Sequence, residues 1–192
     1  MHPIPLTDLR RQHEECWPEW IAVQQTLLER SAWILGPELS AFEAEFARAT
    51  GAPHAVGVAT GTAALQIALR MRGVTSADHH VLTSPLTAPF TATAIRAAGG
   101  TPAFADIDPE TLLLDPDRAE AALTPNTAAI VPVHLYGQTL DLDRWGALSR
   151  RRDMPLIQDA CQAHGAAENR RPLAGASRLA AERFIPHHNT GR

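Results

Sequence analysis

The sequence predicts an α/β fold in which a mostly parallel sheet is covered by helices. Short apolar runs recur along the chain, and segments with helical periodicity lie between them. The runs are apolar at successive positions, which is typical of parallel strands that are buried on both faces. The 192 residues, 45% of them hydrophobic, are enough for one ordinary domain with its own core.

The first part of the chain is expected to be a helical arm that covers residues 1–35. After Pro18, one apolar stripe with helical spacing is formed by Trp20, Ile21, Leu27 and Leu28. A polar side with Arg10 and Arg11 faces away from it. This pattern is typical of a helix that presents one apolar face.

A second, shorter helix is expected near residue 40. Ser40 and Glu43 have the spacing of a capping box. In this motif the serine side chain accepts a hydrogen bond from the backbone amide of the glutamate, and the glutamate side chain accepts one from the backbone amide of the serine. Phe42 and Phe46 would share one face, and Gly51 lies just beyond the expected end.

Five apolar runs are expected to be strands, and helices are expected between them. The runs, in order, cover residues 55–58, 81–83, 103–105, 129–133 and 156–157. Helical periodicity marks residues 65–72 and 142–152. We expect the sheet domain to cover residues 36–181 and a tail to cover residues 182–192, and the alternating pattern is already lost from residue 178.

Composition excludes several classes of function. The 17 basic and 21 acidic residues give a net charge of −4, and every basic residue is Arg, because the chain contains no Lys. A mildly acidic chain lacks the positive surface that binds nucleic acid. No apolar stretch reaches the about 18 residues that span a bilayer, and the N-terminus lacks a signal-peptide pattern. We therefore expect a cytoplasmic protein without nucleic-acid or membrane partners.

The cysteines and histidines give no sign of a disulfide framework or a metal site. Cys16 and Cys161 are far apart in the sequence, which favours two reduced thiols. The nine histidines show neither a His-Glu-x-x-His pattern nor the Cys/His spacing of zinc ligands. No metal is expected.

The candidate binding residues follow the expected strands, because ligands of open α/β sheets lie at the carboxyl ends of the strands. Gly61 and Thr62 begin a helix whose amides and dipole favour a phosphate, or they form a plain turn with Thr62 as helix cap. Asp159 could pair with a protonated pyridine nitrogen or cap a helix. Phe90 could stack on a heterocycle or lie in the core.

Taken together, several motifs resemble those of the DegT/DnrJ/StrS aminotransferases. The resemblance runs from about residue 4 to about residue 181, and because separate motifs occur in the right succession, chance agreement is disfavoured. The motifs that carry it are residues 36–39, 42–43, 61–65, 106–108, 133–138 and 159–166.

The resemblance implies the large domain of a fold type I pyridoxal phosphate enzyme. Such enzymes are usually homodimers that transfer an amino group from an amino acid such as glutamate to a keto-sugar nucleotide or a cyclitol. By position, Gly61 and Thr62 would hold the cofactor phosphate, and Phe90 would stack on its ring. Asp159 would pair with the pyridinium nitrogen, and Gln162 would contact the ring hydroxyl.

The tail departs from the family pattern at the residue that matters most for catalysis. The family reads like Ser-Phe-Tyr-Pro-Thr-Lys-Asn-Leu-Gly where this chain has residues 183–191, so His188 stands at the position of the Schiff-base Lys. Imidazole forms no Schiff base with an aldehyde, and ordinary transamination therefore loses its usual catalyst. The chain also has about half the length typical of the family, so part of the large domain and the small domain are expected to be missing.

Three interpretations remain open at this stage. The first is an N-terminal, catalytically incomplete part of a sugar aminotransferase, which we favour. The second is a pyridoxal-phosphate-dependent sugar dehydratase in which His188 is the catalytic base. The third is a non-catalytic member of the family that acts by association with another subunit.

Overall fold

The computed structural model describes residues 8–31, 33–173 and 180–181. The described part contains the following elements, in chain order: α1 (Arg10–Arg30), α2 (Pro37–Thr50), α3 (Gly61–Met71), β1 (His80–Thr83), α4 (Pro89–Ala98), β2 (Thr101–Phe104), α5 (Pro116–Ala121), β3 (Thr127–Ile130), the 3-10 turn η1 (Leu135–Gly137), α6 (Leu142–Arg152), β4 (Gln158–Asp159), β5 (Ala167–Glu168), β6 (Arg171–Pro172) and β7 (Ala180–Ala181).

The main sheet is parallel, as the sequence predicts. Strand β1 pairs in parallel with β2 on one side and with β3 on the other. Parallel bridges from Ile130 to Leu156 and from Val133 to Asp159 continue the sheet to β4, which pairs in parallel with β7. Strands β5 and β6 form a separate antiparallel pair. The order across the main sheet is therefore β2-β1-β3-β4-β7.

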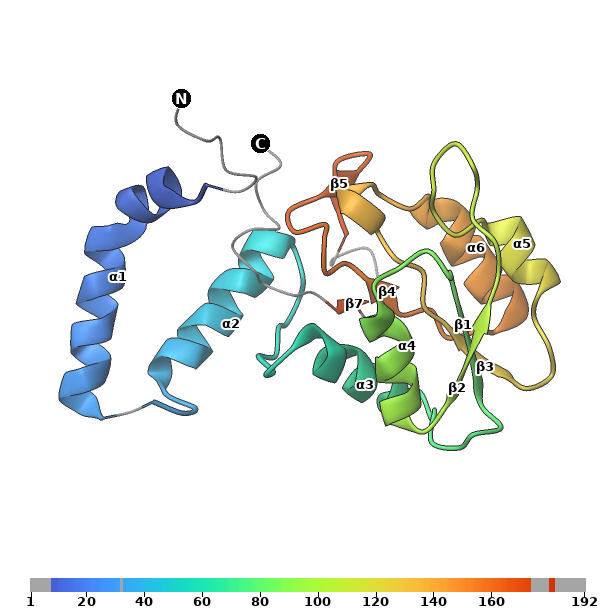
Figure 1. The fold of residues 1–192 in the computed structure, drawn as a ribbon, viewed down its shortest axis with the longest axis horizontal. Helices are drawn as coiled ribbons and strands as arrows, with labels where there is room; N and C mark the ends of the chain where they lie inside the picture. Colours follow the sequence, from blue (N-terminus) through green and yellow to red (C-terminus); the bar gives the residue numbers. More distant parts are fainter. Residues whose placement is uncertain (1–7, 32, 174–179, 182–192) are drawn as a thin grey trace, which may run out of the picture.

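Helices cover both faces of this sheet, and successive strand residues point to opposite faces. Val81 packs in one core cluster with side chains of α3 and α4. Its neighbour Leu82 packs in a second cluster with side chains of α5 and α6, of which Trp145 is the largest. Figure 1 shows these two helix pairs with the strands between them. Burial on both faces explains why the two central residues of β1, Val81 and Leu82, are both apolar.

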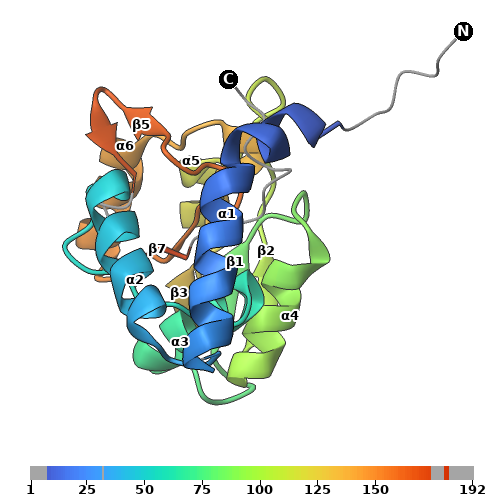
Figure 2. The same ribbon diagram turned by 90° about the vertical axis from the view of Figure 1, so that its left-hand side faces the viewer.

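The predicted helix of the N-terminal part is present as α1, which begins ahead of Pro18. Figures 1 and 2 show α1 at the outside of the molecule, with α2 between it and the sheet domain. None of its described residues is buried, and its exposed apolar side chains include Trp17 and Trp20, whose rings stack with centroids 5.2 Å apart. No described helix is both long and apolar enough to cross a membrane.

Two local predictions are wrong. The capping box at Ser40 and Glu43 is not formed, because α2 already begins at Pro37 with Gly36 as its N-cap. The Glu43 carboxylate instead accepts a hydrogen bond of 2.7 Å from the amide of Gly57. The second error concerns residues 55–58, which form no strand although they are apolar. A strand requires a hydrogen-bonded neighbour, and no described strand lies beside this segment.

Truncation of Trp145 should strongly destabilise the fold, because this side chain is 1% exposed and fills the core between α6 and the sheet. We expect Trp145→Ala to lower the free energy of unfolding by about 3–5 kcal/mol, measured by urea denaturation. Trp33→Ala is the matched control, since Trp33 is 58% exposed. A similar loss in both variants would contradict the assignment of Trp145 to the core.

Candidate functional site

Asp159 lies at the carboxyl end of β4 and is only 5% exposed. Its Oδ2 accepts a hydrogen bond of 3.0 Å from the hydroxyl of Thr91, and its Oδ1 accepts one of 3.2 Å from the amide of Cys161. The second bond closes a turn, not a helix, so the alternative of a helix cap is wrong. No described residue forms an ion pair with Asp159. Two fixed donors thus hold a buried carboxylate that has no ion-pair partner within the described ranges.

His134 follows Val133, the residue that pairs with Asp159 across the parallel ladder, and it is fully buried. Its amide donates to the carbonyl of Asp159 at 3.0 Å. On the ring, Nδ1 accepts from the amide of Leu140 at 3.1 Å, so the proton is on Nε2, which donates to Oε1 of Gln158 at 2.9 Å. Burial lowers the pKa of His134 from its ordinary value of 6.5, although Gln158 and the charge of Asp159 act in the opposite direction.

Gln162 follows Asp159 in the same loop and is half-buried. Its Oε1 accepts a hydrogen bond of 2.7 Å from the amide of Tyr136. Tyr136 has φ 56° and ψ 22°, a left-handed conformation that is uncommon for a large side chain, and Gly137 follows with φ 83°. Because the oxygen of Gln162 is used by the protein, its NH₂ group is the part that could donate to a ligand.

Gly61 and Thr62 form the first turn of α3. The N-cap is Thr60, whose hydroxyl oxygen accepts from the amide of Ala63 at 3.0 Å, so the alternative of Thr62 as the cap is wrong. The amides of Gly61 and Thr62 donate to no residue within the described ranges. Both amides are therefore oriented as a helix N-terminus presents them to an anion.

Phe90 is the second residue of α4, after Pro89. Its side chain is 52% exposed, which excludes the alternative of a core residue. The next residue, Thr91, carries the hydroxyl that is bonded to Asp159. Phe90 is therefore an accessible residue next in the chain to the threonine that contacts the carboxyl end of β4.

The structure brings three of the predicted site residues to one edge of the sheet. Phe90 is connected to Asp159 through Thr91, and Gln162 is connected to it through the turn at Cys161. Gly61 and Thr62 belong to α3, which packs against α4 and β7, but no hydrogen bond among the described residues joins them to Asp159. His188 lies outside the described residues.

Sequence reasoning missed Thr91 and the role of His134 in this region. Thr91 is 68 residues away from Asp159 in the sequence, so no local pattern connects them. His134 was visible only as a member of the motif 133–138, where its position after the fourth apolar run places it at the carboxyl end of a strand.

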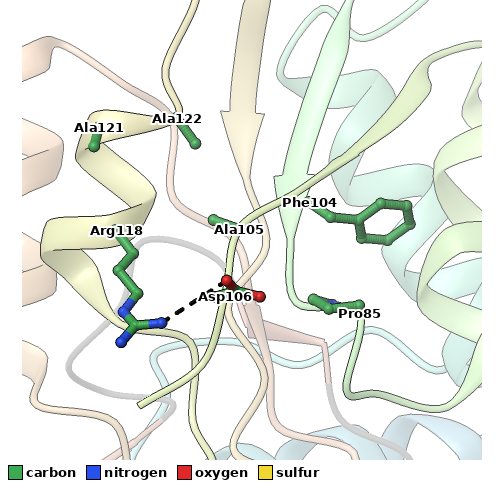
Figure 3. Close-up of a pocket in the computed structure, with 7 residues that line it drawn as sticks. All are labelled: Pro85, Phe104, Ala105, Asp106, Arg118, Ala121 and Ala122. Atoms are coloured by element: carbon green, nitrogen blue, oxygen red, sulfur yellow. Dashed lines mark ion pairs between the residues drawn. The ribbon is translucent and has the colours of Figure 1, made fainter.

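An open cavity of about 510 Å³ lies beside the edge strand β2. Figure 3 shows the Arg118 side chain of α5 pointing toward Asp106, and their charged atoms are 3.8 Å apart. The ring of Phe104 points to the other side. None of the predicted site residues lines this cavity. The part of the chain that the structure describes also holds no cluster of three or more residues suited to a metal ion.

Comparison with known proteins identifies the family. Residues 18–190 match the DegT/DnrJ/EryC1/StrS aminotransferase family. The chain belongs to this family. Its members are pyridoxal-phosphate-dependent aminotransferases, so the resemblance seen in the motifs is confirmed over most of the sequence.

Two curated relatives align over nearly the whole chain. A pleiotropic regulatory protein of Geobacillus stearothermophilus is 39% identical over 98% of this chain and 50% of its own length. A dTDP-3-amino-3,4,6-trideoxy-alpha-D-glucose transaminase of Streptomyces venezuelae is 39% identical over 98% of this chain and 49% of its own length. The chain therefore spans about half the length of the curated relatives that it matches.

Solved structures confirm the predicted fold class. DesV of S. venezuelae, in complex with a ketimine intermediate, superimposes with a TM-score of 0.89 at 36% identity, covering 95% of this chain and 48% of that one. NtdA of Bacillus subtilis, with bound PMP, gives a TM-score of 0.82 at 28% identity over 88% of this chain and 39% of that one. The fold is that of the fold type I aminotransferases over the part covered.

The buried imidazole of His134 should make stability depend on pH. The unfolded chain takes up a proton at this residue as the pH falls through 6.5, whereas the folded chain resists it, so its contribution is complete above pH 6.5 and is lost below. We expect wild type to lose more stability than His134→Asn between about pH 7.5 and about pH 5.5, measured by urea unfolding.

The control for this prediction is His13→Asn, which removes an exposed imidazole from α1. It should retain the pH dependence of the wild type. Long-range nitrogen–proton NMR should also show the proton of His134 on Nε2 at neutral pH. Equal pH dependence in wild type and His134→Asn would contradict the prediction.

Proposed function

We propose that the chain is the cofactor-binding part of a pyridoxal-phosphate-dependent aminotransferase of the sugar-nucleotide or cyclitol type. The observation that carries the proposal is Asp159, a buried carboxylate held by two donors and without a cation among the described residues. The acceptor would be a keto-sugar nucleotide or a cyclitol, and the donor an amino acid such as glutamate. The sugar transaminase from S. venezuelae supports the substrate class.

The residues of the site fit the cofactor. A protonated pyridine nitrogen would supply the positive partner that the buried carboxylate of Asp159 requires. When bound, the cofactor supplies an electron sink that stabilises negative charge at the carbon next to the amino group. Asp159 keeps the ring nitrogen protonated, which is the condition for this chemistry. NtdA, a structural neighbour with bound PMP, supports a cofactor of this class.

The remaining contacts would orient the ring. The amides of Gly61 and Thr62 would hold the phosphate at the N-terminus of α3. The accessible side of Phe90 would stack on the ring. Gln162 would donate from its NH₂ group to the ring hydroxyl, because Tyr136 fixes the opposite end of the amide. Together with the contact of Asp159, these four contacts need no amine of the protein.

The covalent part of the reaction lacks its usual residue in this chain. The 192 residues include no Lys, and the family's Lys position holds His188, outside the described residues. Without a lysine amine, nothing in the described site can bind the cofactor aldehyde covalently or move a proton as that amine does. We therefore propose that the 192-residue chain binds the cofactor without covalent attachment and does not complete transamination by itself.

We further propose a homodimer and a cytoplasmic location. The apolar side chains of Trp17 and Trp20 are exposed on α1, and a second copy of the chain would cover them. The chain has only two cysteines, Cys16 and Cys161, far apart in the sequence, and this sparse use of cysteine supports a reducing compartment.

A second candidate function is non-catalytic association with another protein. The curated relative from G. stearothermophilus is named as a pleiotropic regulatory protein, and the chain lacks the family's Lys. In this case the fold would act through a surface and not through chemistry. Association without any affinity for the cofactor would favour this candidate over the first.

Replacement of Asp159 should weaken cofactor binding. Because Asp159→Asn removes a charge-assisted hydrogen bond, we expect the Kd for pyridoxamine 5′-phosphate to rise by about 10- to 100-fold, measured by fluorescence titration. Asp106→Asn is the matched control, since Asp106 also follows a strand of the sheet but its side chain is largely exposed. Equal affinity of wild type and Asp159→Asn for pyridoxamine 5′-phosphate would contradict the proposed role of Asp159.

Introducing an amine at position 188 should create covalent cofactor binding. Wild type mixed with pyridoxal 5′-phosphate and then borohydride should give no reduced adduct in the site, whereas His188→Lys should give one at residue 188, detected by peptide mass spectrometry. His187→Lys is the control for a nonspecific amine. A cofactor-dependent loss of a sugar hydroxyl that disappears in His188→Asn would instead identify a dehydratase.

A further inference from the structure

We propose that Thr91 is a positioning residue that fixes the carboxylate of Asp159 toward the ring nitrogen of the cofactor, and that Thr87 fixes Thr91 in turn. The inference rests on the proposed function, since it concerns the same site. Thr91 and Thr87 touch no reacting atom in this scheme. Their role is to hold the orientation of one oxygen of Asp159.

The contact between Thr91 and Asp159 is a buried bond between two distant parts of the chain. Thr91 is 2% exposed, and its hydroxyl lies 3.0 Å from Oδ2 of Asp159. It connects the first turn of α4 with the end of β4. Because the other oxygen is bonded to the amide of Cys161, the plane of the carboxylate is set by two donors at once.

Thr91 makes this bond instead of the one that a helical threonine ordinarily makes. A threonine inside a helix can donate to the carbonyl four residues earlier, and Thr93 does so, donating to Pro89 at 2.9 Å. Thr91, two residues earlier on the same helix, donates to Asp159. The difference between these two threonines shows that the hydroxyl of Thr91 serves a tertiary contact and not the helix.

The direction of the hydrogen bonds follows from the number of protons. A carboxylate accepts only, so the single hydroxyl proton of Thr91 must point to Asp159. The hydroxyls of Thr87 and Thr91 are 3.2 Å apart, and Thr91 has no proton left for this contact. Thr87 is therefore the donor, and the chain runs from Thr87 to Thr91 to Asp159.

This arrangement has a consequence for the cofactor. A donor that points at a carboxylate stabilises its negative charge, and a charge-assisted bond is about twice as strong as a neutral one. The fixed Oδ2 and Oδ1 leave the remaining lone pairs of Asp159 in a defined orientation for the N–H of the ring. Loss of the Thr91 hydroxyl should therefore weaken one contact, the one with the ring nitrogen.

The test compares two ligands that differ only at this atom, pyridoxamine 5′-phosphate and its 1-deaza analogue, in which carbon replaces the ring nitrogen. Thr91→Val keeps the shape of the side chain and removes the hydroxyl. We expect it to raise the Kd for pyridoxamine 5′-phosphate about 10-fold and to change the Kd for the 1-deaza analogue less than about 2-fold. Thr91→Ser should restore most of the affinity.

The controls are Thr93→Val and Thr87→Val, with folding of each variant checked by circular dichroism. Thr93→Val removes a hydroxyl from the same helix and should change neither Kd. Thr87→Val leaves the Thr91 hydroxyl in place and should raise the Kd for pyridoxamine 5′-phosphate about 3-fold, again without affecting the analogue. This variant tests the inference independently if Thr91→Val does not fold.

Three outcomes would overturn the inference. An equal loss of affinity for both ligands in Thr91→Val would show a structural role only. Unchanged affinity in a folded Thr91→Val, or in Thr87→Val where Thr91→Val is unfolded, would remove the positioning role while the proposed function stands. If the wild-type chain binds neither ligand, the proposed function itself fails, and the inference fails with it.

Discussion

The parallel ladder between residues 130–134 and 155–159 is the constraint on which the candidate site depends. Asp159 donates from its amide to the carbonyl of Pro132 and accepts at its own carbonyl from the amide of His134, both at 3.0 Å. These backbone bonds place Asp159 and His134 at the same edge of the sheet. Because the backbone of Asp159 is fixed on this side, its carboxylate can be buried at the end of the strand, where the hydroxyl of Thr91 and the amide of Cys161 donate to it.

The sheet can hold such a group because helices cover both of its faces. Alternate residues such as Val81 and Leu82 pack into opposite core clusters, so the strands are anchored from both sides. The same packing orients α4, whose first turn carries Thr91 to Asp159. Packing in the core and hydrogen bonding at the edge are therefore coupled. A change that rotates α4 would move the donor away from the carboxylate without touching either strand.

The sequence predicts those parts of the structure that depend on residues close together in the chain better than those that depend on contacts between distant residues. The helix at residues 142–152 and the central strand near residue 82 follow from periodicity and apolar runs, and both are where the sequence places them. Residues 55–58 have the same apolar character but no described neighbour to pair with, and pattern alone does not reveal a missing partner. Asp159 was predictable from its position after the apolar run at residues 156–157, and it is the last residue of β4. Its donor Thr91, by contrast, depends on a contact that only the folded chain creates.

The chemistry of the proposed site would separate cofactor selection from covalent attachment. Every contact assigned to the ring and the phosphate comes from backbone amides, a carboxylate, a side-chain amide and an aromatic face, and none of these groups is an amine. In the proposed binding mode, selection of a protonated pyridine ring would therefore follow from Asp159 and its donors, whatever residue occupies position 188. A lysine adds a bond to the aldehyde and a proton carrier, which affect the rate of reaction more than the recognition of the ring. A chain without lysine can thus retain the first property while it lacks the second.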